Sequence, residues 1–291
     1  MMLLIMSLNV VAIGELLWDY LPSGKRLGGA PSNFIYHCSK AGSKAFLLSA
    51  VGKDKLGNDA ISQMKEKNID SNYIQINDKR TSTVEIKISD GGVPTYNILD
   101  DVAWDYIQIN KENKILINKA DILYFGTLAQ RNSYSKRTIT KLLSGFKNKK
   151  LVVYDLNLRK NYYSKKIIFD SIHNSNILKL NLEELKILTN LKISVKETKE
   201  KQLEYLLKKF DLKLIALTMG EKGSMLVTKS EISYLPAIDV KIIDTVGAGD
   251  AFTASAVISF ANGINLNQIH HKAVEIASFV CSKNGGMPNY N

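Results

Sequence analysis

The chain has 291 residues, of which 45% are hydrophobic and 23% charged, which excludes a wholly disordered protein and leaves room for one α/β domain with a small appendage. The formal net charge is +11, but the lysines are spread along the chain and no basic run alternates with aromatic residues. This pattern predicts a solvated, lysine-rich surface and argues against a nucleic-acid-binding protein.

The first fourteen residues form an apolar run, MMLLIMSLNVVAIG, that resembles a signal peptide. The run lacks a positively charged start and a small-residue cleavage site, and it is shorter than the roughly 20 apolar residues that span a bilayer. We therefore expect a buried first strand that ends at Gly14, and no membrane partner. The two cysteines, Cys38 and Cys281, have no metal-ligand spacing, which favours a reducing, cytoplasmic setting.

Short apolar runs alternate with longer amphipathic segments along most of the chain. Six runs are predicted to form buried strands: Val10–Ile13, Ala45–Leu48, Ile122–Phe125, Leu151–Tyr154, Ile177–Leu180 and Leu214–Leu217. Four segments between them suit amphipathic helices: Asn58–Lys67, Ser133–Phe146, Leu182–Leu188 and Lys196–Lys209. The alternation predicts an α/β fold with a mostly parallel central sheet and helices on both faces.

One region departs from this alternation. From Thr83 to about Ile109 apolar residues recur at every second position, with a Gly91-Gly92 turn, which predicts antiparallel strands with one solvated face. Together with residues 16–25 these strands would form a small β lid, at about 83–109, on a single domain of residues 1–291. The lid would close over a ligand or pack against a second copy.

The sharpest chemical signal is the run Asp244-Thr-Val-Gly-Ala-Gly-Asp-Ala-Phe252, which we expect to follow a strand and to open a helix of small residues. Gly247 and Gly249, on either side of Ala248, leave the backbone open, so successive N–H groups can converge on an anion at the helix start. Asp250 would repel a phosphate there unless it accepts a proton, as transfer to an alcohol requires. The alternative is that Asp250 only caps the helix.

This run resembles the D-T-x-G-A-G-D-x-F signature of the ribokinase-type family of carbohydrate kinases, with every fixed position present. The resemblance implies a ribokinase-like fold, with Asp250 as the catalytic base and Gly247–Gly249 as an anion hole. It also implies a monovalent cation, K⁺, that orders the anion hole. The ligands of that cation would be Asp244 and backbone carbonyls around Thr245, Val246, Val280 and Gly285.

A second signal is Gly28-Gly29-Ala-Pro-Ser-Asn33, preceded by Asp19. The two glycines let a polar ligand approach the backbone, and Asn33 offers both a donor and an acceptor to hydroxyl groups. Pro31 also suits an ordinary helix start, which is the alternative interpretation. The run resembles the family's N-terminal G-G-x-x-x-N signature, which implies that Asp19, Gly28, Gly29 and Asn33 hold the sugar.

Polar residues also follow two of the predicted strands. Asp155-Leu-Asn-Leu-Arg159 places Arg159 at the carboxyl end of a strand, where it could grip substrate or phosphate, or order the loop with Asp155. Asn181-Leu-Glu-Glu184 resembles the family's N-x-x-E motif, which implies that Asn181 lies near the phosphates and Glu184 near Mg²⁺ through water. The same two residues also suit a helix cap.

The run Thr218-Met-Gly-Glu-Lys-Gly223 resembles the family's T-x-G-x-x-G nucleotide turn, which implies that Thr218, Gly220 and Gly223 lie beside ATP. A β-turn without a ligand is the alternative. The chain has no G-x-x-x-x-G-K-[ST] run and no H-R-D or D-F-G set, which excludes P-loop enzymes and protein kinases. None of the four histidines has a spacing typical of a metal site.

Several other runs resemble fructokinases most: Gly14–Asp19, Leu27–Pro31, Val102–Asp105 and Gly126–Arg131. Trp18, Trp104 and Tyr106 would then shield the site when the lid closes, or pack a lid dimer.

The predicted activity is Mg²⁺-dependent transfer of the γ-phosphate of ATP to a sugar hydroxyl, with D-fructose giving fructose 6-phosphate. Ribose, 2-keto-3-deoxygluconate, a nucleoside or a sugar phosphate stay open as substrates, as does a non-catalytic sensor on the same fold. The resemblance also allows a homodimer formed through the lid.

Overall fold

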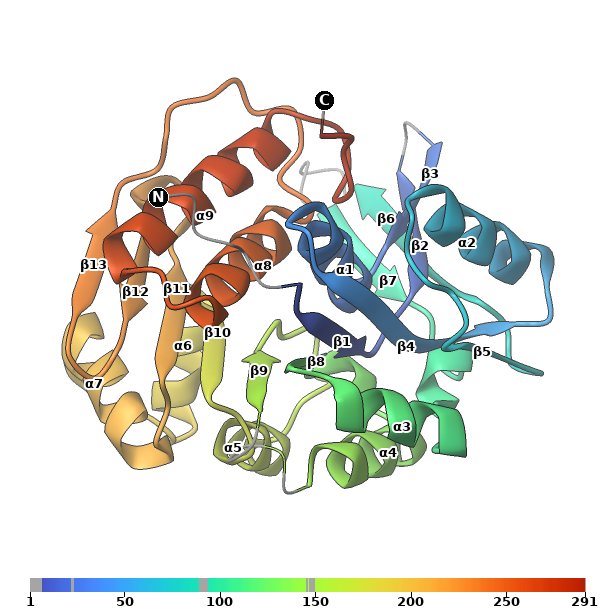
Figure 1. Ribbon diagram of the computed structural model, residues 1–291, viewed down its shortest axis with the longest axis horizontal. Helices are drawn as coiled ribbons and strands as arrows, with labels where there is room; N and C mark the ends of the chain where they lie inside the picture. Colours follow the sequence, from blue (N-terminus) through green and yellow to red (C-terminus); the bar gives the residue numbers. More distant parts are fainter. Residues whose placement is uncertain (1–6, 22–23, 89–93, 145, 147–149, 291) are drawn as a thin grey trace.

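The computed structural model describes residues 7–21, 24–88, 94–144, 146 and 150–290. A nine-stranded sheet forms its centre, in the order β13-β12-β11-β10-β9-β8-β1-β4-β5 (Figure 1). The strands of this sheet are β1 (Asn9–Ile13), β4 (Lys44–Gly52), β5 (Ile74–Asn77), β8 (Ile122–Gly126), β9 (Leu151–Asp155), β10 (Ile177–Asn181), β11 (Leu214–Thr218), β12 (Ser224–Val227) and β13 (Ile232–Leu235). Neighbouring strands from β5 to β11 pair in parallel, whereas β12 and β13 are antiparallel, so the predicted mostly parallel sheet is confirmed.

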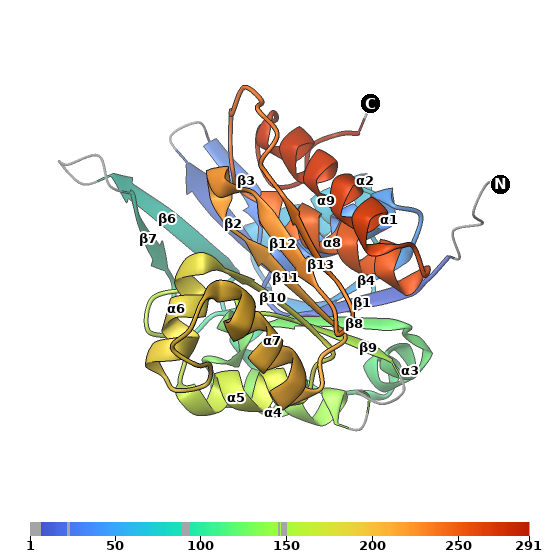
Figure 2. The ribbon, with the colours of Figure 1, turned by 90° about the vertical axis from the view of Figure 1, so that its left-hand side faces the viewer.

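Helices cover both faces of the sheet (Figure 2). One face carries α1 (Ala30–Lys40), α2 (Lys55–Glu66), α8 (Ala248–Ala261) and α9 (Leu266–Cys281). The other carries α3 (Lys111–Lys119), α4 (Ser133–Leu143), α5 (Lys165–His173), α6 (Leu182–Asn190) and α7 (Lys199–Phe210). Alternate strand residues enter two separate apolar cores: Val11 and Ile13 pack in one, and Val10 and Ala12 in the other. Burial on both faces explains why the central strands are apolar without interruption.

Two helices begin at a polar cap rather than at the residue that the sequence predicted. α2 starts at Lys55 instead of Asn58 because the Asp54 side chain accepts a hydrogen bond from the Gly57 N–H at 2.7 Å. α7 starts at Lys199 instead of Lys196 because Thr198 caps it in the same way. Three short 3₁₀ helices complete the helical elements of the described residues, at Ala103–Tyr106, Leu128–Gln130 and Gly220–Lys222.

A second sheet of four strands stands beside the central one, in the order β3-β2-β6-β7. Its strands are β2 (Leu17–Leu21), β3 (Gly24–Gly28), β6 (Ser82–Ile88) and β7 (Pro94–Ile98). The β6–β7 pair extends away from the body of the molecule (Figure 2). Strands from both segments of the predicted lid therefore pair in one small sheet, which is a candidate for that lid.

The small sheet ends at Ile98 and does not continue to Ile109 as predicted. Ala103–Tyr106 instead forms a 3₁₀ helix that packs on the central domain, where Trp104 is fully buried and stacks on the Arg131 guanidinium. Trp18 is also buried, with its Nε1 donating to the Leu56 carbonyl at 2.9 Å. These tryptophans are core residues, because their large apolar surface is more stable inside, so they do not form the shield over the site that the sequence suggested.

The chain reverses its direction of travel across the central sheet between β1 and β8. From β1 it goes outward through β4 and β5, and from β8 it goes outward on the other side to β13. Parallel α/β sheets bind ligands at such a switch point, outside the carboxyl ends of the strands. Asp155, Asn181 and Thr218 are the last residues of β9, β10 and β11, so the fold collects three of the predicted site segments at this edge. None of the helices in the described part of the chain combines the length and apolar character that crossing a bilayer needs.

Candidate active site

The predicted anion hole lies at the start of α8. Gly247 precedes the helix with a φ of 77°, and a Cβ there would lie 2.4 Å from the Gly286 Cα, so only glycine fits. α8 begins at Ala248 without a side-chain cap, which leaves N–H groups of its first turn to bind an anion. One expectation is wrong: no strand precedes the motif, because residues 236–245 are irregular after β13.

Asp250 is buried in the first turn of α8. Its Oδ2 accepts a hydrogen bond of 2.8 Å from Asn33 Nδ2, which α1 brings in from the other end of the chain. Burial raises the pKa of Asp250 to about 7, and the negative charge of Asp155 adds to the shift, while Lys179 and the bond from Asn33 oppose it. A carboxyl that titrates near neutrality is suited to accept a proton.

A buried lysine that no sequence motif singled out lies against the anion hole. Lys179 in β10 has its Nζ 3.2 Å from Asp155 Oδ1, and a Cβ on Gly249 would lie 3.3 Å from the same Nζ. Burial alone would lower the pKa of Lys179, but the carboxylates of Asp155, Glu184 and Asp250 raise it, so the side chain stays cationic. The signal in the sequence was a single lysine within the apolar strand Ile177–Leu180.

The residues predicted to hold the sugar lie around two carboxyls: Asn33 bonds to Asp250, and Gly28 lies against Asp19. Asp19 on β2 faces the Gly28 backbone, where a Cβ would lie 2.1 Å from Asp19 Oδ2, so a side chain at Gly28 would displace the carboxylate. Burial raises the pKa of Asp19 to about 6, and Arg159 on the loop after β9 opposes that shift. The charge of Arg159 also acts on Asp250, which places it within electrostatic reach of both carboxyls.

Glu15, just after β1, is a further buried carboxyl in this group. Gly29 has a φ of 107°, and a Cβ there would lie 2.4 Å from the Glu15 carbonyl oxygen, so this close approach requires glycine. Burial raises the pKa of Glu15 to about 7, and Arg159 lowers it. Within the described part of the chain, Glu15 Oε2 and Asn33 Oδ1 are buried without a hydrogen-bond partner. Buried polar atoms are normally paired, so these two atoms suit the hydroxyl groups of a ligand.

Asn181 and Glu184 form a capping box at the start of α6. Asn181 Oδ1 accepts from the Glu184 N–H at 2.9 Å, and Glu184 Oε2 accepts from the Asn181 N–H at 2.8 Å. Glu184 Oε1 also accepts from the Leu158 N–H at 2.8 Å, so backbone groups engage both carboxylate oxygens. The helix-cap interpretation is therefore realised, and both Glu184 carboxylate oxygens already accept a backbone hydrogen bond. Among the described residues, no group of three or more Asp, Glu, His or Cys side chains could hold a metal ion.

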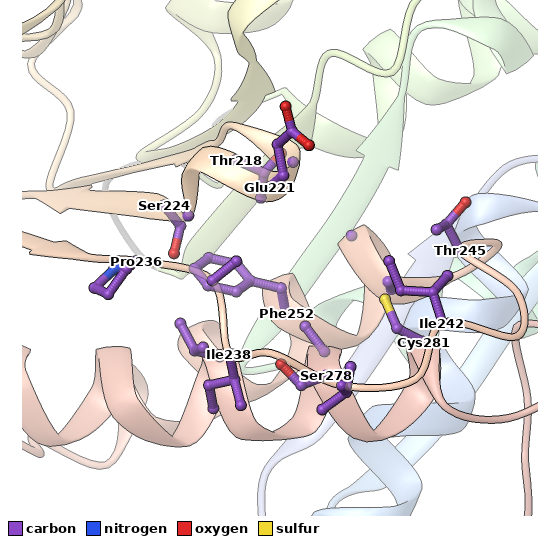
Figure 3. Close-up of a pocket in the computed structure, with 18 of the residues that line it drawn as sticks. Thr218, Glu221, Ser224, Pro236, Ile238, Ile242, Thr245, Phe252, Ser278 and Cys281 are labelled. Carbon is purple, nitrogen blue, oxygen red and sulfur yellow. The ribbon is translucent and has the colours of Figure 1, made fainter.

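A cavity of about 540 Å³ adjoins the anion hole (Figure 3). Thr218, Gly220 and Gly223 of the predicted nucleotide turn line it, together with Thr245, Ala248 and Gly249 of the anion-hole motif. Apolar side chains that sequence motifs missed form much of the remaining wall: Ile238, Ile242, Phe252, Val274, Ala277 and Cys281. An apolar chamber that opens onto helix N–H groups suits a ligand with an aromatic ring at one end and phosphates at the other.

The expected monovalent-cation site does not fit a bound K⁺. Asp244 Oδ1 accepts from the Val246 N–H at 3.0 Å, and Oδ2 accepts from the Gly285 N–H at 2.9 Å and from Arg26 Nη1 at 3.0 Å. The Val280 carbonyl accepts from the Lys283 N–H at 3.0 Å. A guanidinium thus already neutralises the carboxylate that the cation would need.

Comparison with known proteins identifies the family. Residues 23–290 match the model described as pfkB family carbohydrate kinase. An uncharacterized sugar kinase of Pyrococcus horikoshii, PH1459, is 28% identical in an alignment 295 residues long, gaps included, which covers 95% of this chain and 91% of that protein. A fructokinase of Salmonella typhimurium is 25% identical over 272 residues, which cover 89% and 87%. An ATP-dependent 6-phosphofructokinase of Thermoanaerobacterium thermosaccharolyticum is 26% identical over 277 residues, which cover 89% and 84%.

Solved structures show the same fold. The crystal structure of PH1459 superimposes with a TM-score of 0.84 over 96% of this chain and 93% of that one, and its complex with ATP with 0.81 over 96% and 94%. A fructokinase of Vibrio cholerae O395, solved with fructose, ADP and potassium, has a TM-score of 0.78 over 97% and 94%, and at 21% identity it shows the fold alone. With its motifs at one edge of the sheet and a family match over nearly its whole length, this chain belongs to the pfkB family of carbohydrate kinases.

Proposed function

We propose that this protein transfers the γ-phosphate of ATP to a hydroxyl group of D-fructose, giving fructose 6-phosphate. The observation that carries the proposal is the environment of Asp250, a buried carboxyl with a pKa raised to about 7 in the first turn of an uncapped helix. A proton acceptor and an anion-binding helix start lie within one helical turn of each other. Transfer of a phosphoryl group to an alcohol needs both at the same point.

The residues around Asp250 have distinct roles in this reaction. Asp250 accepts the proton of the attacking hydroxyl, and the N–H groups that follow Gly247 stabilise charge on the phosphoryl group as it moves. Asn33 holds the Asp250 carboxylate through its amide nitrogen and offers its unpaired Oδ1 to the sugar. Lys179 keeps a positive charge beside Gly249, where negative charge arrives. Mg²⁺ carried on the phosphates would neutralise the leaving diphosphate, with Glu184 behind a water molecule.

Support for ATP as the phosphate donor comes from the cavity and from a relative. The cavity is large enough for a nucleotide, and its walls include Thr218, Gly220 and Gly223 of the predicted nucleotide turn. Sugar kinase PH1459, which is 28% identical, was solved in complex with ATP.

The small sheet formed by β2, β3, β6 and β7 is proposed as the lid over the sugar. A homodimer that forms through this sheet is a further proposal.

Support for an unphosphorylated sugar comes from two cations that lie just before β6 of the small sheet. Lys79 pairs with Asp101 at 2.8 Å, and Arg80 donates to the Asp100 carbonyl at 3.3 Å, so both are engaged by the protein itself. Relatives named as fructokinases favour fructose, whereas the relative named as a 6-phosphofructokinase keeps fructose 6-phosphate in the set to be tested.

An assay that couples ADP formation to NADH oxidation tests the proposal. The purified protein is supplied with Mg²⁺ and ATP, and with fructose, ribose, glucose, 2-keto-3-deoxygluconate, adenosine or fructose 6-phosphate. We expect turnover on fructose, with a product that phosphoglucose isomerase converts, which fructose 1-phosphate would not allow. Asp250→Asn should lose a factor of roughly 10² to 10⁴ in turnover, while Asp78→Asn, which alters an exposed carboxylate paired with Lys53, should keep its turnover. Turnover on another sugar would replace fructose, and none on any sugar would refute the kinase proposal.

A further inference from the structure

Three separate parts of the chain meet at the Asp244 carboxylate. The anion-hole loop contributes the Val246 N–H, the segment after α9 contributes the Gly285 N–H, and the small sheet contributes Arg26 from β3. The Asp244 and Arg26 side chains are 16% and 28% exposed, so water is partly excluded from their ion pair. Charge-assisted hydrogen bonds of this kind are among the stronger ones in proteins.

Contacts lead from Arg26 to the anion hole itself. A Cβ on Gly285 would lie 3.3 Å from Arg26 Cδ, so the arginine stem rests on this glycine. The next residue, Gly286, touches the anion-hole loop, because a Cβ on Gly247 would lie 2.4 Å from the Gly286 Cα. A Cβ on Gly286 would in turn lie 2.8 Å from Asn33 Oδ1. The arginine therefore braces the segment that supports both the anion hole and the residue that holds Asp250.

We propose that Arg26 takes the place of a monovalent cation at the anion hole, so that this kinase needs no K⁺. A bound cation would neutralise Asp244 and tie the anion-hole loop to the segment after α9. The Arg26 guanidinium already does both, and it would repel a second positive charge at the same carboxylate. Because Arg26 belongs to the small sheet, order in the anion hole also depends on the position of that sheet. This inference rests on the proposed kinase function for its catalytic consequence alone.

The first experiment replaces the monovalent cation around the wild-type protein. Turnover and the thermal unfolding midpoint, with and without ATP and Mg²⁺, are measured in potassium, sodium or choline chloride at equal ionic strength. We expect each quantity to be the same in the three salts, with turnover within about twofold. Activation by potassium of about tenfold or more, or a rise of the unfolding midpoint in potassium alone, would overturn the proposal. The unfolding midpoints require no turnover, so this arm stands even if the sugar or the activity is assigned wrongly.

The second experiment removes the guanidinium. Arg26→Gln should lose about tenfold or more of its turnover in choline chloride and recover part of it in potassium chloride, because a cation can then reach Asp244. The matched control is Lys25→Gln, which removes the same charge from the neighbouring residue of β3, paired with Asp59 at 2.6 Å. Arg26→Lys keeps the positive charge, so its turnover should not depend on potassium. If Arg26→Gln does not fold, the turnover of Arg26→Lys in the two salts tests the proposal in its place. Full activity of Arg26→Gln in choline chloride would show that Arg26 has no such role.

Discussion

Replacing Asp250 by asparagine should remove nearly all turnover and, at the same time, stabilise the folded protein at alkaline pH. Asparagine has almost the shape of aspartate, and its oxygen can still accept the 2.8 Å hydrogen bond from Asn33. It cannot accept a proton from the sugar, so turnover should fall by roughly 10² to 10⁴, the usual scale for loss of a general base. ATP binding should persist, because the N–H groups at the start of α8 are unchanged.

The gain in stability follows from the raised pKa. Asp250 has a pKa of about 7 in the folded protein against 3.8 for a free side chain, chiefly because burial disfavours the charged form. At about 1.4 kcal/mol for each pKa unit, ionisation of this carboxyl costs the folded state up to about 4 kcal/mol. A carboxyl with a raised pKa carries this cost fully above the folded value, and the cost vanishes below the unfolded value. The variant should therefore gain stability between about pH 4 and pH 7 and keep the gain above that range.

Thermal unfolding of both proteins at about pH 8 and pH 4 measures this effect, with an expected gain of a few degrees at the higher pH only. The control Asp78→Asn changes an exposed carboxylate whose pKa Lys53 lowers, so it should show no such gain. The wild-type kcat/KM should also decline below about pH 7 as Asp250 becomes protonated. The electrostatic reasoning would be refuted if Asp250→Asn were less stable than the wild type at pH 8. It would also be refuted if the variant's unfolding midpoint differed from that of the wild type by the same amount at pH 8 and pH 4. Near-normal turnover would refute the assignment of the base.

Two further changes test the residues around the base. Lys179→Met should destabilise the protein by about 3 to 5 kcal/mol, measured by chemical denaturation, because it leaves the buried Asp155 carboxylate without its cation. It should also shift the acidic limb of the kcat/KM profile to higher pH, because Lys179 lowers the pKa of Asp250, and an unchanged limb would contradict this. Gly223→Ala should unfold the nucleotide turn, since its Cβ would lie 2.0 Å from a backbone oxygen, whereas Gly220→Ala has open space and should cost only about 1 to 2 kcal/mol; equal unfolding midpoints for the two variants would contradict this difference.

The sequence predicted the parts of the site that depend on local chemistry. Glycines such as Gly247 and Gly29 are needed where the backbone has a positive φ and touches another segment, and such positions leave a visible motif. The apolar strands were equally clear, because both of their faces are buried. Local signals of this kind can be interpreted without knowing what lies across the fold.

Features that depend on contacts between distant segments were not predictable. Lys179 is an ordinary lysine until Asp155 and Gly249 are placed around it by the sheet and by α8. Trp104 was assigned to the lid because it lies in the region from Thr83 to about Ile109, yet Arg131 from another segment stacks on it inside the core. Arg26 reaches Asp244 across 218 positions of the chain, a separation that no motif spacing records.

The hydrogen bond between Asn33 and Asp250 joins residues 217 positions apart, which has a consequence for how the protein folds. Contacts between distant segments form slowly, because a long loop must close before they contribute. During refolding, helices and neighbouring strands can form before α1 and α8 meet, and the base has no partner until then. Recovery of activity should therefore lag behind recovery of secondary structure, so that enzymatic turnover reports the completion of the last long-range contact rather than the collapse of the chain.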